Sequence, residues 1–238
     1  MKKYEFTNET RKVNNHILHR IKALKDFEDV HKGDIGGWLE NESNLSQEGD
    51  CWVSDYAIVY GEAYVGENAK VGERASVIDS ANISGNARVY GATMVSENAR
   101  VYKDAQIYDD AQVYGNAVIC DDAEIYGNAQ VYDEAFIRGT AKVYEGACIG
   151  GTATVYDKAQ VYGTAWVLGG ASVGGTAKVY GDAEVFEGAS VGGNAQVYGK
   201  ASIGGTAQVY GNARVYGDAQ VYGNARVENA SIVDTAVV

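Results

Sequence analysis

The sequence contains no proline, only three cysteines and three histidines, and no long apolar run. Proline cannot donate to a backbone ladder, so its absence from all 238 residues is compatible with β-structure throughout the chain. The three cysteines, Cys51, Cys120 and Cys148, form no C-x-x-C pair, and an odd number cannot all pair within the chain. We therefore expect free thiols in a reducing compartment.

No apolar stretch approaches the length of a membrane span, and no apolar run follows the positive charges of the first segment, MKKYEFTNETRKV. These absences predict a chain without a signal peptide or membrane partner, located in the cytoplasm of the producing cell, with a virion as the alternative location. The net charge is −12, which disfavours non-specific binding to nucleic acid.

A six-residue repeat occupies most of the chain. From Val53, 29 consecutive hexads run without a break to Arg226. Their first residue is always Val or Ile, and their fifth is Ala except at Thr93. The third and fourth residues are mostly Gly, Asp, Glu, Asn or Thr, which tolerate corners. Residues two apart in a strand share one side, so the Ala and Val or Ile residues predict the core of a parallel β-solenoid.

The second residue of each hexad indicates how many hexads form one coil. Every third hexad, counted from Val53, carries Tyr in eight of ten cases, whereas the other two classes together carry it in seven of 19. This distribution predicts coils of three hexads and a triangular cross-section. The eight tyrosines of this class are Tyr90, Tyr108, Tyr126, Tyr144, Tyr162, Tyr180, Tyr198 and Tyr216.

The hexads, such as VSDYAI, VYGEAY and VGENAK, resemble the hexapeptide repeat of left-handed β-helix proteins, which include bacterial acyltransferases. Residues 32–60, KGDIGGWLENESNLSQEGDCWVSDYAIVY, resemble YdcK-like solenoid proteins, many of them encoded by phages or prophages and often described as transferases or polymer-forming proteins. The resemblance implies an all-β, left-handed parallel β-helix. Only the resemblance gives the left hand, because general connection rules favour the right hand.

Residues 1–38 lack the repeat, and we expect them to form a small N-terminal β cap. The alternation of Ile17, His19, Ile21 and Ala23 favours strands, although Ile17, Leu18, Ile21 and Leu24 also fit one helical face. Residues 39–238 are expected to form the solenoid.

A short C-terminal cap is expected from residue 227, where the repeat slips by one residue in VENAS. The ends of a solenoid need caps because an open coil is an unpaired sheet edge. This cap is thin and apolar, which makes a dimer by end-to-end pairing one hypothesis. The resemblance implies a different homo-oligomer, a trimer packed through flat faces.

Acyltransferases of the left-handed β-helix type use a histidine on a coil as general base. Here His16, His19 and His31 all precede the repeats, and no loop interrupts a hexad. We therefore predict no catalytic residue, no cofactor and no metal site. Acidic corners, such as Asp109 and Asp121, are interpreted as solvated positions, with a calcium or magnesium site as the alternative.

A second outward column lies two residues before the tyrosines and is mainly basic or amide in character: Arg88, Gln106, Glu124, Lys142, Gln160, Lys178, Gln196 and Arg214. The tyrosines could stack on one another and only stabilise the fold. Alternatively, together with Arg88, Lys142, Lys178 and Arg214, they form a binding face for a protein or glycan. Trp166, Leu168 and Phe186 form a candidate oligomer patch on another face.

Three functions are consistent with these features. The first is a non-catalytic structural or interaction solenoid associated with a phage or prophage, which binds through its flat outer faces. The second is an acyltransferase-like enzyme or a remnant of one. The third is an acidic inhibitor or decoy of a host protein, which rests on the charge alone.

Overall fold

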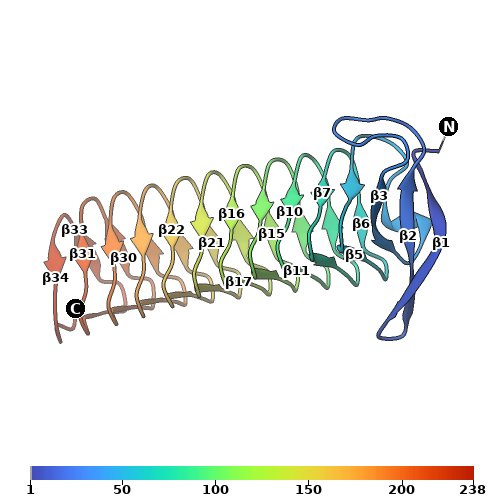
Figure 1. The fold of residues 1–238 in the computed structure, drawn as a ribbon. Coiled ribbons are helices and arrows are strands. Elements are labelled where there is room, and N and C mark those ends of the chain that lie inside the picture. Colours follow the sequence, from blue (N-terminus) through green and yellow to red (C-terminus); the bar gives the residue numbers. More distant parts are fainter. Residues whose placement is uncertain (1) are drawn as a thin grey trace. The chain divides into compact units, whose positions relative to one another are not determined.

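The computed structural model describes residues 2–238 as an all-β parallel β-solenoid with almost no helix (Figure 1). The chain divides into two compact units, Met1–Gly115 and Asn116–Val238. In each unit the coils contribute short strands to three sheets, which form the three walls of a triangular coil.

Unit 1 begins with an antiparallel hairpin that continues into the first wall. The strands of this wall, in spatial order, are β1 (Tyr4–Val13), β2 (His16–Ala23), β3 (Ile35–Leu39), β5 (Ile58–Val59), β8 (Ser76–Val77), β11 (Met94–Val95) and β14 (Gln112–Val113). The second wall contains β4 (Trp52–Val53), β7 (Lys70–Val71), β10 (Arg88–Val89) and β13 (Gln106–Ile107). The third contains β6 (Tyr64–Val65), β9 (Asn82–Ile83) and β12 (Arg100–Val101), and one 3-10 turn, η1 (Glu42–Asn44), precedes the regular coils.

Unit 2 consists of regular coils. Its first wall contains β17 (Gln130–Val131), β20 (Cys148–Ile149), β23 (Trp166–Val167), β26 (Glu184–Val185), β29 (Ser202–Ile203) and β32 (Gln220–Val221). The second contains β16 (Glu124–Ile125), β19 (Lys142–Val143), β22 (Gln160–Val161), β25 (Lys178–Val179), β28 (Gln196–Val197), β31 (Arg214–Val215) and β34 (Ser231–Ile232). The third contains β15 (Val118–Ile119), β18 (Phe136–Ile137), β21 (Thr154–Val155), β24 (Ser172–Val173), β27 (Ser190–Val191), β30 (Gln208–Tyr210) and β33 (Arg226–Glu228).

Parallel pairing confirms the predicted coil of three hexads. Arg88 is the partner of Gln106 in unit 1, and Lys142 is the partner of Gln160 in unit 2, an offset of 18 residues in both cases. The inward side of these strands carries the predicted core, since Val and Ile at the first hexad position are at most 1% exposed. Alanine at the fifth position lines the same interior, and only Ala225 among the hexad alanines is not fully buried.

The corners show why acidic residues and glycine share the third hexad position. That residue has a positive φ, for example 60° at Asp121 and 72° at Gly139. The Asp121 carboxylate accepts a hydrogen bond from the Gly139 amide of the next coil at 3.1 Å, and Glu145 accepts one from Gly163 at 2.8 Å. The corner carboxylates therefore have a structural task, because they satisfy amides that the backbone ladder leaves free.

The N-terminal segment forms strands, as predicted, and the helical alternative is wrong. β1 pairs with β2 in antiparallel register, with a shift between Phe6 and Thr10. A second irregularity occurs where β2 pairs with β3. Because of these shifts the simple alternation fails: Leu18 is fully buried, whereas Ile17 is 57% exposed.

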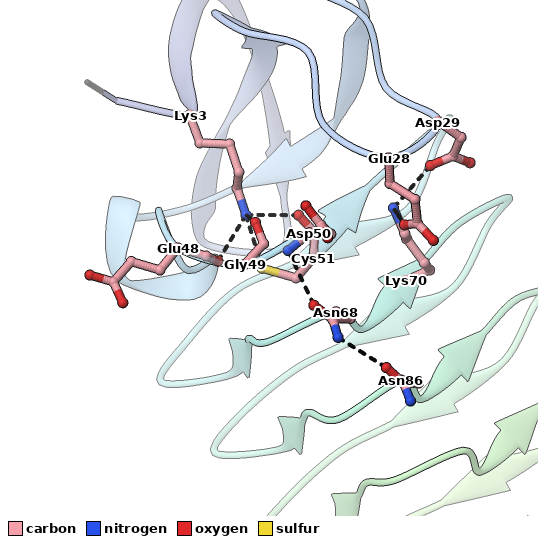
Figure 2. Close-up of polar contacts among 10 residues, drawn as sticks. All are labelled: Lys3, Glu28, Asp29, Glu48, Gly49, Asp50, Cys51, Asn68, Lys70 and Asn86. Carbon is pink, nitrogen blue, oxygen red and sulfur yellow. Dashed lines mark hydrogen bonds and ion pairs between the residues drawn. The ribbon is translucent and has the colours of Figure 1, made fainter.

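Lys3 attaches the hairpin to the first coil (Figure 2). Its side chain is fully buried, and Nζ donates hydrogen bonds to the carbonyl oxygen of Cys51 at 2.9 Å and to the Cys51 thiol at 3.1 Å. The carbonyl oxygens of Glu48 and Gly49 also accept from Nζ, each at 3.3 Å. Burial lowers the pKa of the Lys3 ammonium and raises the pKa of the Cys51 thiol. One cation thus satisfies several acceptors of the segment that enters the regular coils.

The predicted register slip near the C-terminus is confirmed. Gln208 still pairs with Arg226 at an offset of 18, but Arg214 pairs with Ser231 at an offset of 17. Asn229, which has a positive φ of 52°, lies where the residue is lost. The slip keeps Ile232 in register with Val215, although Ile232 is only half-buried.

Thr93, the single exception to alanine at the fifth hexad position, is expected to cost stability. It is 1% exposed, and its hydroxyl has no hydrogen-bond partner among the described residues. Replacement by valine keeps the shape and removes the unsatisfied hydroxyl, so Thr93→Val should raise the free energy of unfolding by about 1 kcal/mol. Chemical denaturation measures this, with the outward Thr154→Val as the control, and a lower stability of Thr93→Val would contradict the prediction.

Candidate binding face

Six of the predicted tyrosines form a continuous stack in unit 2. The rings of Tyr126, Tyr144, Tyr162, Tyr180, Tyr198 and Tyr216 follow one another with centroid distances of 4.8–4.9 Å and interplanar angles of 1–6°. Each tyrosine follows a strand of the second wall, so the strand spacing sets the ring spacing. The prediction that these side chains form one file is confirmed for unit 2. Tyr90 and Tyr108 occupy the equivalent positions after β10 and β13 in unit 1.

Stacking determines what this file of rings can offer to a ligand. Each of the four inner rings, Tyr144 to Tyr198, has another ring on both faces. A nucleobase or a sugar therefore cannot stack on these faces without separating the ladder. The remaining contact surface consists of ring edges and hydroxyl groups, which suit a flat partner surface better than a planar ligand.

The basic and amide column lies beside the tyrosines in the same wall. Its members in unit 2 are aligned from Glu124 to Arg214 by strand pairing. Glu124 and Lys142 form an ion pair at 2.9 Å, which neutralises both charges. Lys178 and Arg214 have no hydrogen bond or ion pair among the described residues. We call the six stacked tyrosines and this column from Glu124 to Arg214 the tyrosine face.

The environment of the ladder keeps its phenols protonated. Burial, followed by the neighbouring Tyr162 and Tyr126, raises the pKa of Tyr144 to about 12. Burial also raises the pKa values of Tyr162 and Tyr180. At neutral pH these hydroxyl groups are therefore hydrogen-bond donors as well as acceptors.

The raised pKa values predict that the ladder loses stability at high pH. A tyrosine ionises near pH 10 in an unfolded chain. Because folding raises the pKa of Tyr144 to about 12, its contribution is fully present below pH 10 and is lost as the pH rises through about 12. We expect ultraviolet titration to show a class of late-ionising tyrosines, and Tyr144→Phe to reduce that class. A single transition near pH 10 for all 18 tyrosines would contradict this prediction.

The candidate oligomer patch is also brought together in unit 2. Trp166, Leu168 and Phe186 line a shallow depression of about 100 Å³ on the first wall, together with Glu184 and Val185. Trp166 is 49% exposed, and its strand partner on one side is Cys148, as predicted. Phe186 also contacts Tyr222 edge to face, with 6.0 Å between ring centroids. Whether a second copy covers this patch stays a prediction.

Sequence reasoning missed a function of the glycines at the second hexad position. Gly174 and Gly150 are fully covered, and the rings of Tyr156 and Tyr132 from the preceding coil lie directly over them. A side chain at either glycine would displace its ring. Alternation of aromatic residues and glycine 18 residues apart, visible in the sequence, was the signal that could have revealed this packing.

The three histidines lie in the N-terminal hairpin or the loop after it. His16 pairs with Glu40 at 2.8 Å, His19 stacks on Phe6 with ring centroids 4.9 Å apart, and the backbone amide of His31 donates to Asp34. Burial raises the pKa of Glu40, but the Gly61 amide and His16 outweigh it, and the net shift is downward. Within residues 2–238, no group of three or more His, Cys, Asp or Glu side chains could hold a metal ion.

Among residues 2–238, none of the secondary-structure elements is a helix long and apolar enough to cross a membrane.

Comparison with known proteins agrees with this architecture. The family model described as "YdcK Beta solenoid repeat" matches residues 81–97, 105–121, 207–220 and 219–234. A stretch of 72 residues is 40% identical to the "Uncharacterized acetyltransferase YdcK" of Escherichia coli (strain K12). That match covers 26% of this chain and only 22% of the relative. The chain therefore carries β-solenoid repeats of the YdcK type.

Proposed function

We propose that this chain is a non-catalytic binding solenoid whose tyrosine face recognises an acidic surface of a partner protein. The observation that carries the proposal is the six-ring ladder beside Lys178 and Arg214, two cations without an ion-pair partner among the described residues. These charges stand on a chain with a net charge of −12, so the face differs in sign from its surroundings.

The physical properties of the face suit protein recognition. Tyrosine and arginine are enriched at protein interfaces, where tyrosine offers a large contact area and a hydroxyl group. The rings are held by their neighbours before any partner arrives, so binding loses little side-chain entropy. The free cations favour an acidic partner and increase the rate of its association.

An acetyltransferase is the second candidate, because the curated relative carries that name. Its support is limited to the matched 22% of that protein. The coils of this chain contain no histidine that could act as a general base, since all three histidines precede residue 32. An increase in melting temperature with acetyl-coenzyme A, together with acetyl transfer to an amine or hydroxyl acceptor, would support this candidate over the first.

A charge-reversal pair tests the tyrosine face. In the full chain, Lys178→Glu with Arg214→Glu reverses both free cations and leaves the tyrosine ladder intact. Lys158→Glu with Arg226→Glu makes the same change in charge at exposed residues outside the face. Partners cross-linked and captured from lysate of the source cell are compared quantitatively for the wild type and both variants, and the molar mass of each protein is measured by light scattering.

We expect at least one acidic protein to bind the wild type and the control and to lose about tenfold or more in affinity for the face variant. The binding should weaken with added salt. Equal capture by the face variant, or no partner specific to the wild type, would overturn the proposal. An oligomer that dissociates only in the face variant would show that a second copy occupies the face instead.

A further inference from the structure

A polar groove in unit 1 lies outside the stacked tyrosines. It has a volume of about 460 Å³ and is lined by Glu28, Asp50, Asn68, Lys70, Asn86, Arg88, Asp104 and Gln106. Its floor comes from the outward residues of β7, β10 and β13 and from the corner residues that precede these strands. The loop between β2 and β3, which carries Glu28, forms the opposite side (Figure 2).

Two carboxylates of the loop fix one wall of the groove. Lys70 forms ion pairs with Glu28 at 2.6 Å and with Asp29 at 3.0 Å, and its side chain is only 12% exposed. The hydrogen bond from Lys70 lowers the pKa of Asp29, which keeps this carboxylate ionised. The charge of Lys70 is therefore balanced within the protein, and the loop is held over β7 without a ligand.

A chain of hydrogen bonds runs along the corner side of the groove. The Asp50 amide donates to Asn68 Oδ1 at 3.4 Å, Asn68 Nδ2 donates to Asn86 Oδ1 at 3.0 Å, and Asn86 Nδ2 donates to Asp104 Oδ1 at 2.9 Å. The first two links are visible in Figure 2. Each asparagine thus uses one N–H and one oxygen lone pair, and retains one further donor and one further acceptor. The chain fixes the orientation of these amides before a ligand binds.

Arg88 supplies a free donor group in the middle of the groove. It is exposed and has no hydrogen bond or ion pair among the described residues, although Asn86 and Gln106 also line the groove. Tyr90 follows Arg88 and covers Gly72 of the preceding coil, and its hydroxyl is close enough to Arg88 and Lys70 for their charges to affect its pKa. The groove therefore has an aromatic ring near its cationic side.

The chemistry of this lining selects among ligand classes. An anion would face the carboxylates of Glu28, Asp50 and Asp104, while Lys70 is already neutralised. A metal ion would lack a convergent set of ligands among residues 2–238. A neutral ligand rich in hydroxyl groups can donate to the carboxylates and accept from Arg88 and the amides at the same time. We infer that this groove is a binding site for a neutral saccharide.

The geometry also indicates how the saccharide lies. The corner residues Asp50, Asn68, Asn86 and Asp104 come from four successive coils, and their spacing follows the strand separation of about 4.8 Å. This spacing is comparable to the width of one sugar ring. An oligosaccharide extended across successive coils would therefore meet the same pattern of donors and acceptors at each ring.

Calorimetric titration of the full chain with defined trisaccharides tests this inference. The neutral probes are maltotriose, cellotriose and tri-N-acetylchitotriose, and the charged probes are trigalacturonate and chitosan trimer. Arg88→Ala and Asn86→Ala remove ligand-facing groups, and Arg100→Ala is the control because Arg100 is an exposed strand arginine on the third wall. Melting temperatures of all variants confirm that each is folded.

We expect at least one neutral probe to bind, with an affinity that falls about tenfold or more in Arg88→Ala and Asn86→Ala and is unchanged in Arg100→Ala. Asp104→Asn keeps an acceptor for Asn86 and should alter the affinity for a neutral sugar only slightly. Failure of all neutral probes to bind at millimolar concentration, tighter binding of a charged probe, or affinity unaffected by Arg88→Ala would overturn the inference.

Discussion

Replacement of Lys3 with methionine is expected to detach the N-terminal hairpin from the first coil. Methionine has a similar length, but it leaves the carbonyl oxygens of Glu48, Gly49 and Cys51 without the donor that they share. The side chain is fully buried, so water cannot replace the ammonium without opening the structure. We expect a loss of about 3 kcal/mol in local stability, measured by amide hydrogen exchange of β1, β2 and β3.

Lys2 provides a matched control for this substitution. Its ammonium forms an exposed ion pair with Glu42 at 2.7 Å, and its side chain is 57% exposed. Lys2→Met should therefore change stability by less than about 0.5 kcal/mol. Similar exchange rates in the two variants would show that the contacts of Lys3 do not hold the hairpin in place.

Replacement of Ala171 with leucine is expected to disrupt the coils around it. Ala171 is fully buried, as are Ala153 and Ala189 one coil before and after it. Leucine adds three carbon atoms where valine and isoleucine of the three walls already fill the interior. The expected loss is about 3 kcal/mol or more, because neither the walls nor the backbone ladder can expand locally. Guanidinium denaturation measures the effect, and the transition should also broaden if the coils on either side unfold separately.

The next residue along the chain offers the control for this core substitution. Ser172 belongs to β24, points outward and is half-buried, so Ser172→Leu adds the same side chain outside the core. Its effect should be within about 0.5 kcal/mol. If Ala171→Leu were tolerated equally well, the interior would contain space that the buried alanines do not indicate.

The regular part of the fold was predictable because each structural constraint recurs in every hexad. Val or Ile at the first position and Ala at the fifth gave the inward residues, and Tyr at every third second position gave the coil. The structure confirms both through strand pairs such as Lys142 with Gln160. Even the slip near the C-terminus followed from the sequence, because a lost residue moves Ile232 against Val215.

The features that do not repeat could not be predicted from periodicity. Lys3 is buried because the hairpin folds back onto residues more than 40 positions away, which no local pattern indicates. The groove depends on the position of Glu28 against Lys70, again across 42 residues of sequence. The tyrosine file was predicted, but only the geometry shows that its inner rings cover one another and leave edges and hydroxyls for a partner.

The constant offset between paired strands restricts how the length of such a chain can change. Removing or duplicating a whole coil of 18 residues would leave every outward column on its own side of the prism. Inserting a single hexad would instead rotate everything beyond it by a third of a revolution and carry the tyrosines to a neighbouring side. A homologue can therefore grow or shrink without losing its contact surfaces only in whole coils.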